Sequence, residues 1–305
     1  VLAGDLFCCY EVLFARPLQI CETPHPLPKP TFHYVRSIFS LPDAVIRIND
    51  LIDSGDAANA ELERAILNDP ALTAKLLKFA NSSYFGLSGK VETVLRAISL
   101  IGHKVFRNLV ITSSVTSTLK GIPSDLVDMD TFWHHSVTCG VAARLLACSV
   151  DSRERFFIAG LLHGVGRLIL FSQYPKESAK VLNSMSQGED AAIQAELKIF
   201  GFTHAQLGAE LLKQWRLPPN ICKMVELQLD PMKDETHQYD ACTLCAAVNI
   251  ANFIYPCTNQ RTNSDKKIPN HAFKAWSLLG LSPELIESVI TVARLQIIEV
   301  LNIIR

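Results

Sequence analysis

Hydrophobic residues recur three and four positions apart through most of the chain from about Leu41 onward. The spacing is clear in one early segment, at Val45, Ile48, Leu51 and Ile52, and it returns at Leu72, Leu76 and Leu77. This period is that of amphipathic α-helices, and it predicts an all-α fold of about a dozen helices. Short β-branched stretches lie inside the helical repeats and lack flanking hairpin turns, so they do not indicate strands.

Local residues indicate where helices begin and where the chain divides. Asp69-Pro70 and Ser282-Pro283 each place a capping side chain before a proline that fits the first helical position. Prolines 24, 26, 28 and 30 indicate a non-helical arm, and a second break lies at Gly121–Asp125. We therefore predict an arm or linker over 1–37, an N-terminal helical-bundle subdomain over 38–127, and a second helical subdomain over 128–305 with closing C-terminal helices.

Composition and charge narrow the function classes. The net charge of −1 gives no electrostatic attraction to nucleic acid or to anionic membranes. No uninterrupted apolar run approaches the length of a membrane helix, and no signal peptide is evident. Nine scattered cysteines are typical of reduced thiols in a cytoplasmic protein. Cys242 and Cys245 form a CxxC inside an apolar helical pattern, which favours buried helix cysteines over a redox or zinc site.

The second half of the chain carries an ordered series of motifs, and the first half carries its own. The series as a whole resembles the HDOD family, the HD-related output domain of bacterial signalling proteins. The residues that carry the resemblance are Asp69–Leu77, Ala80–Gly86, Ala97–Gly102, Arg107–Leu109, Phe132–Ser136, Ala159–His163, Phe200–Ala205 and Trp215–Pro218. The match spans about residues 38–300, nearly everything after the proline-rich arm.

This resemblance implies a C-terminal subdomain shaped like an HD phosphohydrolase, packed on the N-terminal helical subdomain. In active HD enzymes, histidines and aspartates bind divalent metals that activate water against a phosphoester. Carboxylates supply the charge that hard cations favour, imidazoles fix the geometry, and the metal lowers the pKa of the bound water.

Several of the implied ligand positions carry side chains that are poor metal ligands or none. His135 and His163 stand at the first two histidine positions, and Gly164 replaces the aspartate that should follow. Gln228 and Leu229 stand where the family often has a His-His pair. The late aspartate position falls at Asn252 or, less plausibly, at Asn249. The resemblance therefore implies a degenerate metal site with no resident metal, cofactor or catalytic residue.

The retained polar residues need another role. We expect His135, His163 and Glu196 to form a buried cluster in which the side chains satisfy one another's hydrogen bonds. Alternatives are a remnant zinc or nickel site built by these histidines with His204, with or without Glu196, and a small-ligand pocket in the same cavity. His204 also has a plain explanation, because Thr203 and Gln206 form a capping box at a helix start.

The N-terminal half contains a candidate interaction loop. Asn81, Ser82, Tyr84 and Phe85 interrupt a helix with small polar residues and two aromatics. The segment is interpreted either as a helix C-terminus and turn or as a loop that presents the aromatics to a partner. Scattered basic residues nearby leave a helix-turn-helix DNA reader as a minor alternative.

Together these observations predict a non-catalytic signal-transduction or regulatory module of the bacterial cytoplasm that acts through protein partners. The first alternative is a metal-dependent phosphohydrolase acting on a nucleotide or phosphoester, and the second is a DNA-binding regulator. Neither membrane insertion nor nucleic-acid binding is expected. The chain begins with Val1, which suggests a piece of a longer polypeptide.

Overall fold

The computed structural model describes residues 41, 43–54, 59–81, 90–118, 122–255 and 269–304. Within these ranges all regular elements are helices, so the all-α prediction is confirmed. The predicted arm over 1–37 lies outside the described residues, as do Ser82, Tyr84 and Phe85 of the candidate interaction loop.

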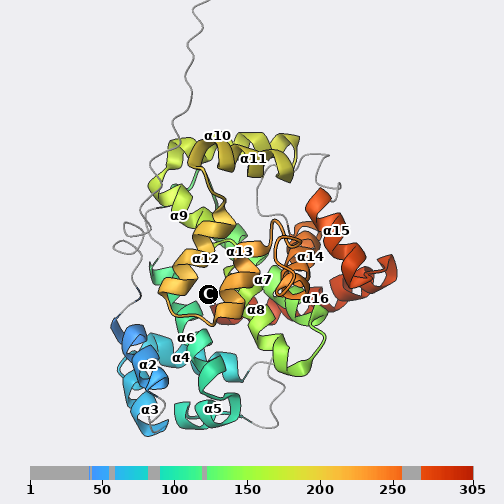
Figure 1. Ribbon diagram of the computed structural model, residues 1–305. Coiled ribbons are helices and arrows are strands. Elements are labelled where there is room, and N and C mark those ends of the chain that lie inside the picture. Colours follow the sequence, from blue (N-terminus) through green and yellow to red (C-terminus); the bar gives the residue numbers. More distant parts are fainter. Residues whose placement is uncertain are drawn as a thin grey trace, which may run out of the picture.

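The first helices form one group, with α2 on α3 and α6, and α4 on α5 and α6. They lie together at the lower left of Figure 1. Their bounds are α2 Asp43–Asp53, α3 Asn59–Leu67, α4 Pro70–Ala80, α5 Val94–Ile101 and α6 His103–Thr118.

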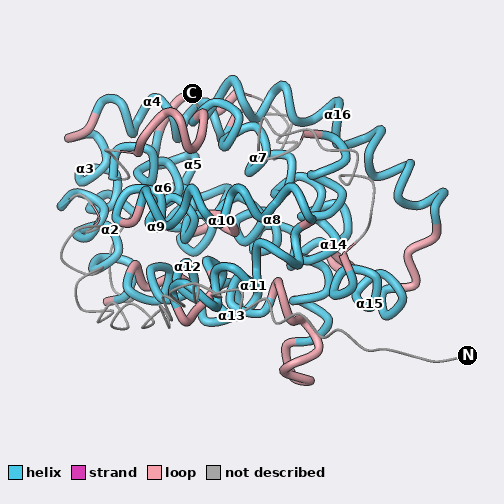
Figure 2. Tube along the Cα trace, turned by 90° about the horizontal axis from the view of Figure 1, so that it is seen from above, coloured by secondary structure: helices cyan, strands magenta, loops and turns pink. Residues whose placement is uncertain are grey.

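The remaining helices are organised around α7, which packs against α8, α14 and α16, while α12 packs against α9 and α13. In Figure 1 the α10–α11 pair lies at the end opposite to α2–α5, and in Figure 2 α14 and α15 lie at the side away from α2 and α3. The bounds are α7 Met129–Leu146, α8 Arg153–Leu162, α9 Val165–Gln173, α10 Pro175–Ser184, α11 Glu189–Phe200, α12 His204–Gln214, α13 Pro219–Leu227, α14 Gln238–Ile254, α15 Asn270–Leu279 and α16 Pro283–Ile304, with short 3₁₀ turns at Val150–Ser152 and Met185–Gln187.

The predicted helix starts are confirmed at the atomic level. Asp69 caps α4 by accepting a 3.0 Å hydrogen bond from the Leu72 backbone N–H, and Pro70 occupies the first helical position. The Ser282 hydroxyl accepts from the Leu285 backbone N–H at 3.3 Å at the start of α16. Both caps satisfy donors that a helix N-terminus leaves unpaired, so the local sequence fixes these boundaries.

An ion-pair network joins α2 and α6 to the turn after α12. Arg107 donates to the Asp53 carboxylate at 2.5 Å and also to the Arg216 carbonyl oxygen. The Arg216 side chain reaches Asp50 at 2.5 Å. Arg216 has a left-handed backbone with φ of 56°, a conformation that costs free energy for a residue other than glycine. Through these bonds the turn after α12 joins the first helix group, α2–α6, to the helices that follow it.

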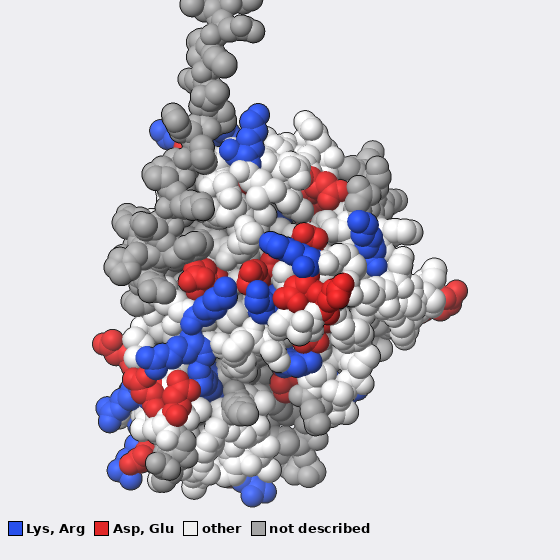
Figure 3. All heavy atoms as spheres, viewed as in Figure 1, with Lys and Arg blue, Asp and Glu red and all other residues white. Residues whose placement is uncertain are grey.

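Two further expectations concern burial and surface charge. Cys242 and Cys245 are buried in α14, as predicted. The stretch Arg153–Gln173 is long and apolar enough to cross a membrane by composition, but 83% of its most apolar window is buried among the other helices. Lys and Arg side chains alternate with Asp and Glu over the face seen in Figure 3.

Candidate functional site

The crossing of α7 and α8 places His135 and His163 side by side. The two helices approach closely because glycines meet there: a Cβ on Gly160 would lie 2.7 Å from the Gly140 Cα. The imidazole centroids are 5.3 Å apart, and the two residues are only 2% and 4% exposed. The pair is therefore a feature of the core.

Each of these imidazoles bonds to a backbone carbonyl oxygen. His135 Nδ1 lies 2.8 Å from the Tyr255 oxygen, at the end of α14, and His163 Nδ1 lies 2.6 Å from the Gly160 oxygen. A carbonyl can only accept, so Nδ1 carries the hydrogen and donates it in both rings. The hydrogen bond to Tyr255 gives His135 a structural task, which is to tie α7 to the end of α14.

Burial keeps both rings neutral. It lowers the pKa of His135 to about 4, and it lowers the pKa of His163 well below the ordinary value, with the neighbouring His135 adding to the effect. At neutral pH the site therefore holds two uncharged imidazoles.

Acid is expected to destabilise the fold through these histidines. The pKa of His135 is depressed in the folded state, so the unfolded chain binds more protons below pH 6.5 and stability falls as the pH drops toward 4. Between pH 7 and pH 5 we expect His135 alone to cost about 2 kcal/mol in the free energy of unfolding. Urea unfolding at each pH measures this loss.

The control is His135→Asn, whose amide can still donate a hydrogen bond to the Tyr255 oxygen. This variant should be less stable at pH 7 but lose less stability per pH unit. An unchanged pH dependence would show that His135 is not the responsible group.

Gly164 is the N-cap residue of α9, and an aromatic side chain packs beside it. A Cβ added at Gly164 would lie 3.1 Å from Phe132 Cε2 and 3.4 Å from Cζ. Any side chain at this position would require the Phe132 ring, which is 1% exposed, to shift by a few tenths of an ångström. The absence of a side chain at Gly164 is thus accompanied by close packing of the Phe132 ring of α7.

Gln228 has taken up a structural role at its predicted ligand position. Its amide nitrogen donates to the His163 carbonyl oxygen at 3.0 Å and to the Val225 oxygen at 3.1 Å. It thereby joins the end of α13 to the end of α8, and it is 2% exposed. Leu229 beside it is half-buried and offers no ligand atom.

Glu196 pairs with His204, which corrects the expected cluster of His135, His163 and Glu196. His204 Nδ1 lies 2.9 Å from both Glu196 carboxylate oxygens, and the His204 backbone N–H donates to one of them at 2.8 Å. Burial opposes ionisation of Glu196, but the attraction and hydrogen bonds of His204, together with Arg167, hold its pKa below the ordinary value. The Thr203–Gln206 capping box is confirmed.

The remaining predicted positions do not complete a metal shell. Asn249 donates to the Cys245 carbonyl oxygen of its own helix at 3.0 Å, and Asn252 is half-exposed. In the described part of the chain, no three His, Cys, Asp or Glu side chains converge in a way that could hold a metal ion. Two neutral imidazoles bonded to backbone oxygens, with Glu196 engaged by His204, do not fit the hard divalent cation of an HD enzyme.

Asn81 is the described member of the candidate interaction loop. Its side chain donates to the Leu77 oxygen at 2.8 Å and to the Val91 oxygen at 2.6 Å, while its own oxygen accepts from the Val91 backbone N–H at 2.6 Å. These bonds hold the end of α4 against the segment before α5, as in the helix-end interpretation.

Sequence reasoning missed three contributors to this region. Phe132 packs beside Gly164, the Tyr255 carbonyl holds His135, and the largely buried Arg167 of α9 lies 3.8 Å from Glu189. Arg167 belongs to the glycine-containing segment that follows His163, so its position near the site could have been inferred from the sequence. A backbone carbonyl distant in sequence gives none.

Known structures share this fold. A candidate phosphohydrolase of Shewanella amazonensis is 23% identical and has a TM-score of 0.69, with 90% of this chain and 97% of that chain covered. An HDOD domain protein of Geobacter sulfurreducens has 22% identity, a TM-score of 0.64 and the same coverage. A candidate signal transduction protein of Marinobacter aquaeolei has 21% identity and a TM-score of 0.63, with 88% of this chain and 60% of that chain covered.

Sequence comparison identifies the family. An uncharacterized protein of Treponema pallidum is 23% identical over 194 residues, which are 63% of this chain and 37% of that protein. The chain thus matches little more than a third of that relative's length. The HDOD domain model matches residues 38–231, more than half of the chain. The resemblance drawn from the motifs is confirmed, and the chain belongs to the HDOD domain family.

Proposed function

We propose that this chain is a non-catalytic regulatory output module of a bacterial signalling pathway, acting in the cytoplasm through contacts with protein partners. The observation that carries the proposal is the environment of Gly164, where an added Cβ would lie 3.1 Å from the buried Phe132 ring. A working metal site with one tolerated substitution would be expected to keep room for that ligand.

The hydrogen bonds around the histidines support the same proposal. The His163 carbonyl accepts from Gln228, and the Nδ1 donors of both histidines are bound to backbone oxygens. Glu196, the one carboxylate among the mapped positions, is engaged with His204. These residues join helix ends to one another, which is a structural task and needs no metal.

Restoring the carboxylate should not restore a metal site. In Gly164→Asp the new Cβ would crowd Phe132, so we expect a loss of about 1–3 kcal/mol in stability. The variant should bind no stoichiometric Mn²⁺, because the ligands at Gln228, Leu229 and Asn252 are still missing. Urea unfolding and metal analysis after dialysis against Mn²⁺ measure both effects.

The matched control is Gly164→Asp combined with Phe132→Ala, which provides space for the carboxylate. It should also remain without metal. If either variant gained one metal ion per chain and hydrolysed a phosphodiester, the site would be only one ligand away from an enzyme and the proposal would fail.

The proposal also states that the chain acts through protein partners, and this part can be tested separately. Tagged chain is exposed to extract of the source cells, and bound proteins are competed with excess untagged chain. We expect a stoichiometric partner that is released by the competitor. Failure to retain any competed protein under all growth conditions of the host would contradict an output role through protein contacts.

A further inference from the structure

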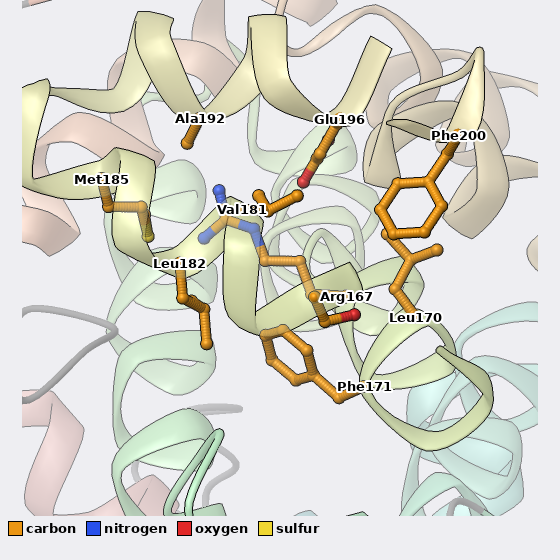
Figure 4. Close-up of a pocket in the computed structure, with 10 residues that line it drawn as sticks. Arg167, Leu170, Phe171, Val181, Leu182, Met185, Ala192, Glu196 and Phe200 are labelled. Atoms are coloured by element: carbon orange, nitrogen blue, oxygen red, sulfur yellow. The ribbon is translucent and has the colours of Figure 1, made fainter. Parts of the chain in front are cut away.

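The space between α9, α10 and α11 does not form a ligand site. Figure 4 shows Arg167 and Glu196 reaching into it and Leu182 and Met185 along one side. Without its open mouth this space is about the size of one water molecule, so a larger ligand does not fit. The surface of the molecule offers a clearer contact site, on α16.

One face of α16 exposes a row of apolar side chains to solvent. Leu295 is 76% exposed and Ile298 is 67% exposed, and Leu285 and Val292 on the same face are also exposed. The opposite face of α16 is buried against α4, α7 and α14. Figure 2 shows α16 along one edge of the molecule. The helix therefore has a second apolar face that no described helix covers, and exposed apolar patches are typical of protein–protein contact sites.

The charges on this face fit a second copy of the chain that runs in the opposite direction. Glu284 and Glu287 lie in the first half of the exposed face, and Arg294 lies in the second half. Glu287 and Arg294 are about two helical turns apart, so they project from the same flank of the helix. In the described part of the chain neither of these two side chains forms an ion pair.

A twofold axis between Ile290 and Thr291 satisfies these charges in both copies at once. It places Arg294 of each chain beside the partner's Glu284 and the partner's Glu287, because residues on one flank of an antiparallel helix pair face each other. A parallel pair in register would place like charges at the same level along the two helices. The charge pattern of α16 is thus complementary to itself only in the antiparallel direction.

The same arrangement covers the exposed apolar residues. Leu295 lies at the level of the partner's Leu285, and Ile298 lies at the first turn of the partner helix. Thr291 is nearest to the axis, and its hydroxyl already donates to the Glu287 carbonyl oxygen at 2.9 Å. Burial of Thr291 in the contact therefore leaves no unpaired hydroxyl.

We propose that the chain forms an antiparallel dimer through α16. Arg294 binds the partner's Glu284 and the partner's Glu287, and Leu295 and Ile298 pack on the first turns of the partner helix. One helix from each chain makes a small contact, so the dimer dissociates on dilution. This inference goes beyond the regulatory role proposed above and does not depend on it, because it concerns the association of identical chains.

Sedimentation velocity of the whole chain over a wide range of concentrations tests the proposal. We expect a species of twice the chain mass to appear as the concentration rises. Leu295→Ser should weaken association at least about tenfold, because this side chain is buried twice in each dimer. The matched control is Leu67→Ser on α3, where the leucine is 53% exposed and lies outside the contact, so association should be unchanged. Urea unfolding of both variants confirms that each is folded.

Charge exchange tests the direction of the helices. Arg294→Glu and Glu287→Arg should each weaken the dimer about tenfold, because like charges then meet across the axis twice. The double variant restores opposite charges and should recover most of the lost association. A chain that stays monomeric at every concentration, or whose α16 face binds a different protein instead, would overturn the proposal. Equal losses in Leu295→Ser and Leu67→Ser, or a double variant no better than the single ones, would overturn it as well.

Discussion

Replacing Gly166 by alanine is expected to destabilise the folded protein by at least about 3 kcal/mol. A Cβ at this position would lie 2.0 Å from the His204 carbonyl oxygen and 2.7 Å from the Gly208 backbone nitrogen. Both atoms belong to the backbone of α12, so no side-chain rotation can relieve the overlap. The start of α9 would have to move away from α12, which would open the core around Glu196 and His204.

The matched control for this substitution is Gly102→Ala. Gly102 has φ of 85°, and an added Cβ there meets nothing within 4 Å. Its cost is the backbone strain alone, about 1–3 kcal/mol, because φ of 85° with ψ of 153° is a conformation that is essentially restricted to glycine. Urea unfolding compares the two variants at pH 7. Equal unfolding midpoints for the two variants would show that close packing of α9 on α12 is not what Gly166 provides.

The second large loss of stability is expected from removing the carboxylate of Glu196. Glu196→Ala leaves the His204 ring and its backbone N–H without their acceptor, in residues that are 3% and 2% exposed. Breaking a buried pair by deleting one partner costs about 3–5 kcal/mol. We expect that loss in the free energy of unfolding at pH 7.

Glu226→Ala is the comparison for the Glu196 substitution. Glu226 lies 3.4 Å from Lys213 and 3.2 Å from Lys223 near the surface, where such pairs contribute less than about 1 kcal/mol. Chemical denaturation of both variants under the same conditions gives the difference. A loss in Glu196→Ala no larger than that in Glu226→Ala would mean that the pair with His204 does not stabilise the fold.

Much of the fold could be predicted from local sequence. The 3.6-residue period gives the helices, and Asp69-Pro70 fixes the start of α4 because the cap and the proline act within one turn. The capping box at Thr203 was predictable for the same reason. These features depend on residues close together in the chain, so tertiary packing does not need to be known.

The site could be predicted only in part. The motifs gave the positions of His135 and His163, but not their hydrogen bonds, because the Tyr255 carbonyl is 120 residues from His135 and Gln228 is 65 residues from His163. The pairing of Glu196 with His204 depends on the conformation of the short connection from Gly201 to Thr203, between α11 and α12. The Phe132 ring at Gly164 is likewise a product of the helix crossing.

The most direct test of the central claim, that an HD scaffold persists here without metal chemistry, is one assay on the purified chain. Hydrolysis of bis(p-nitrophenyl) phosphate is followed in Mn²⁺, and the metal content of the same sample is measured. We expect substoichiometric metal and no hydrolysis above the buffer rate, with His163→Ala altering stability only. Stoichiometric metal together with turnover that His163→Ala abolishes would contradict the claim.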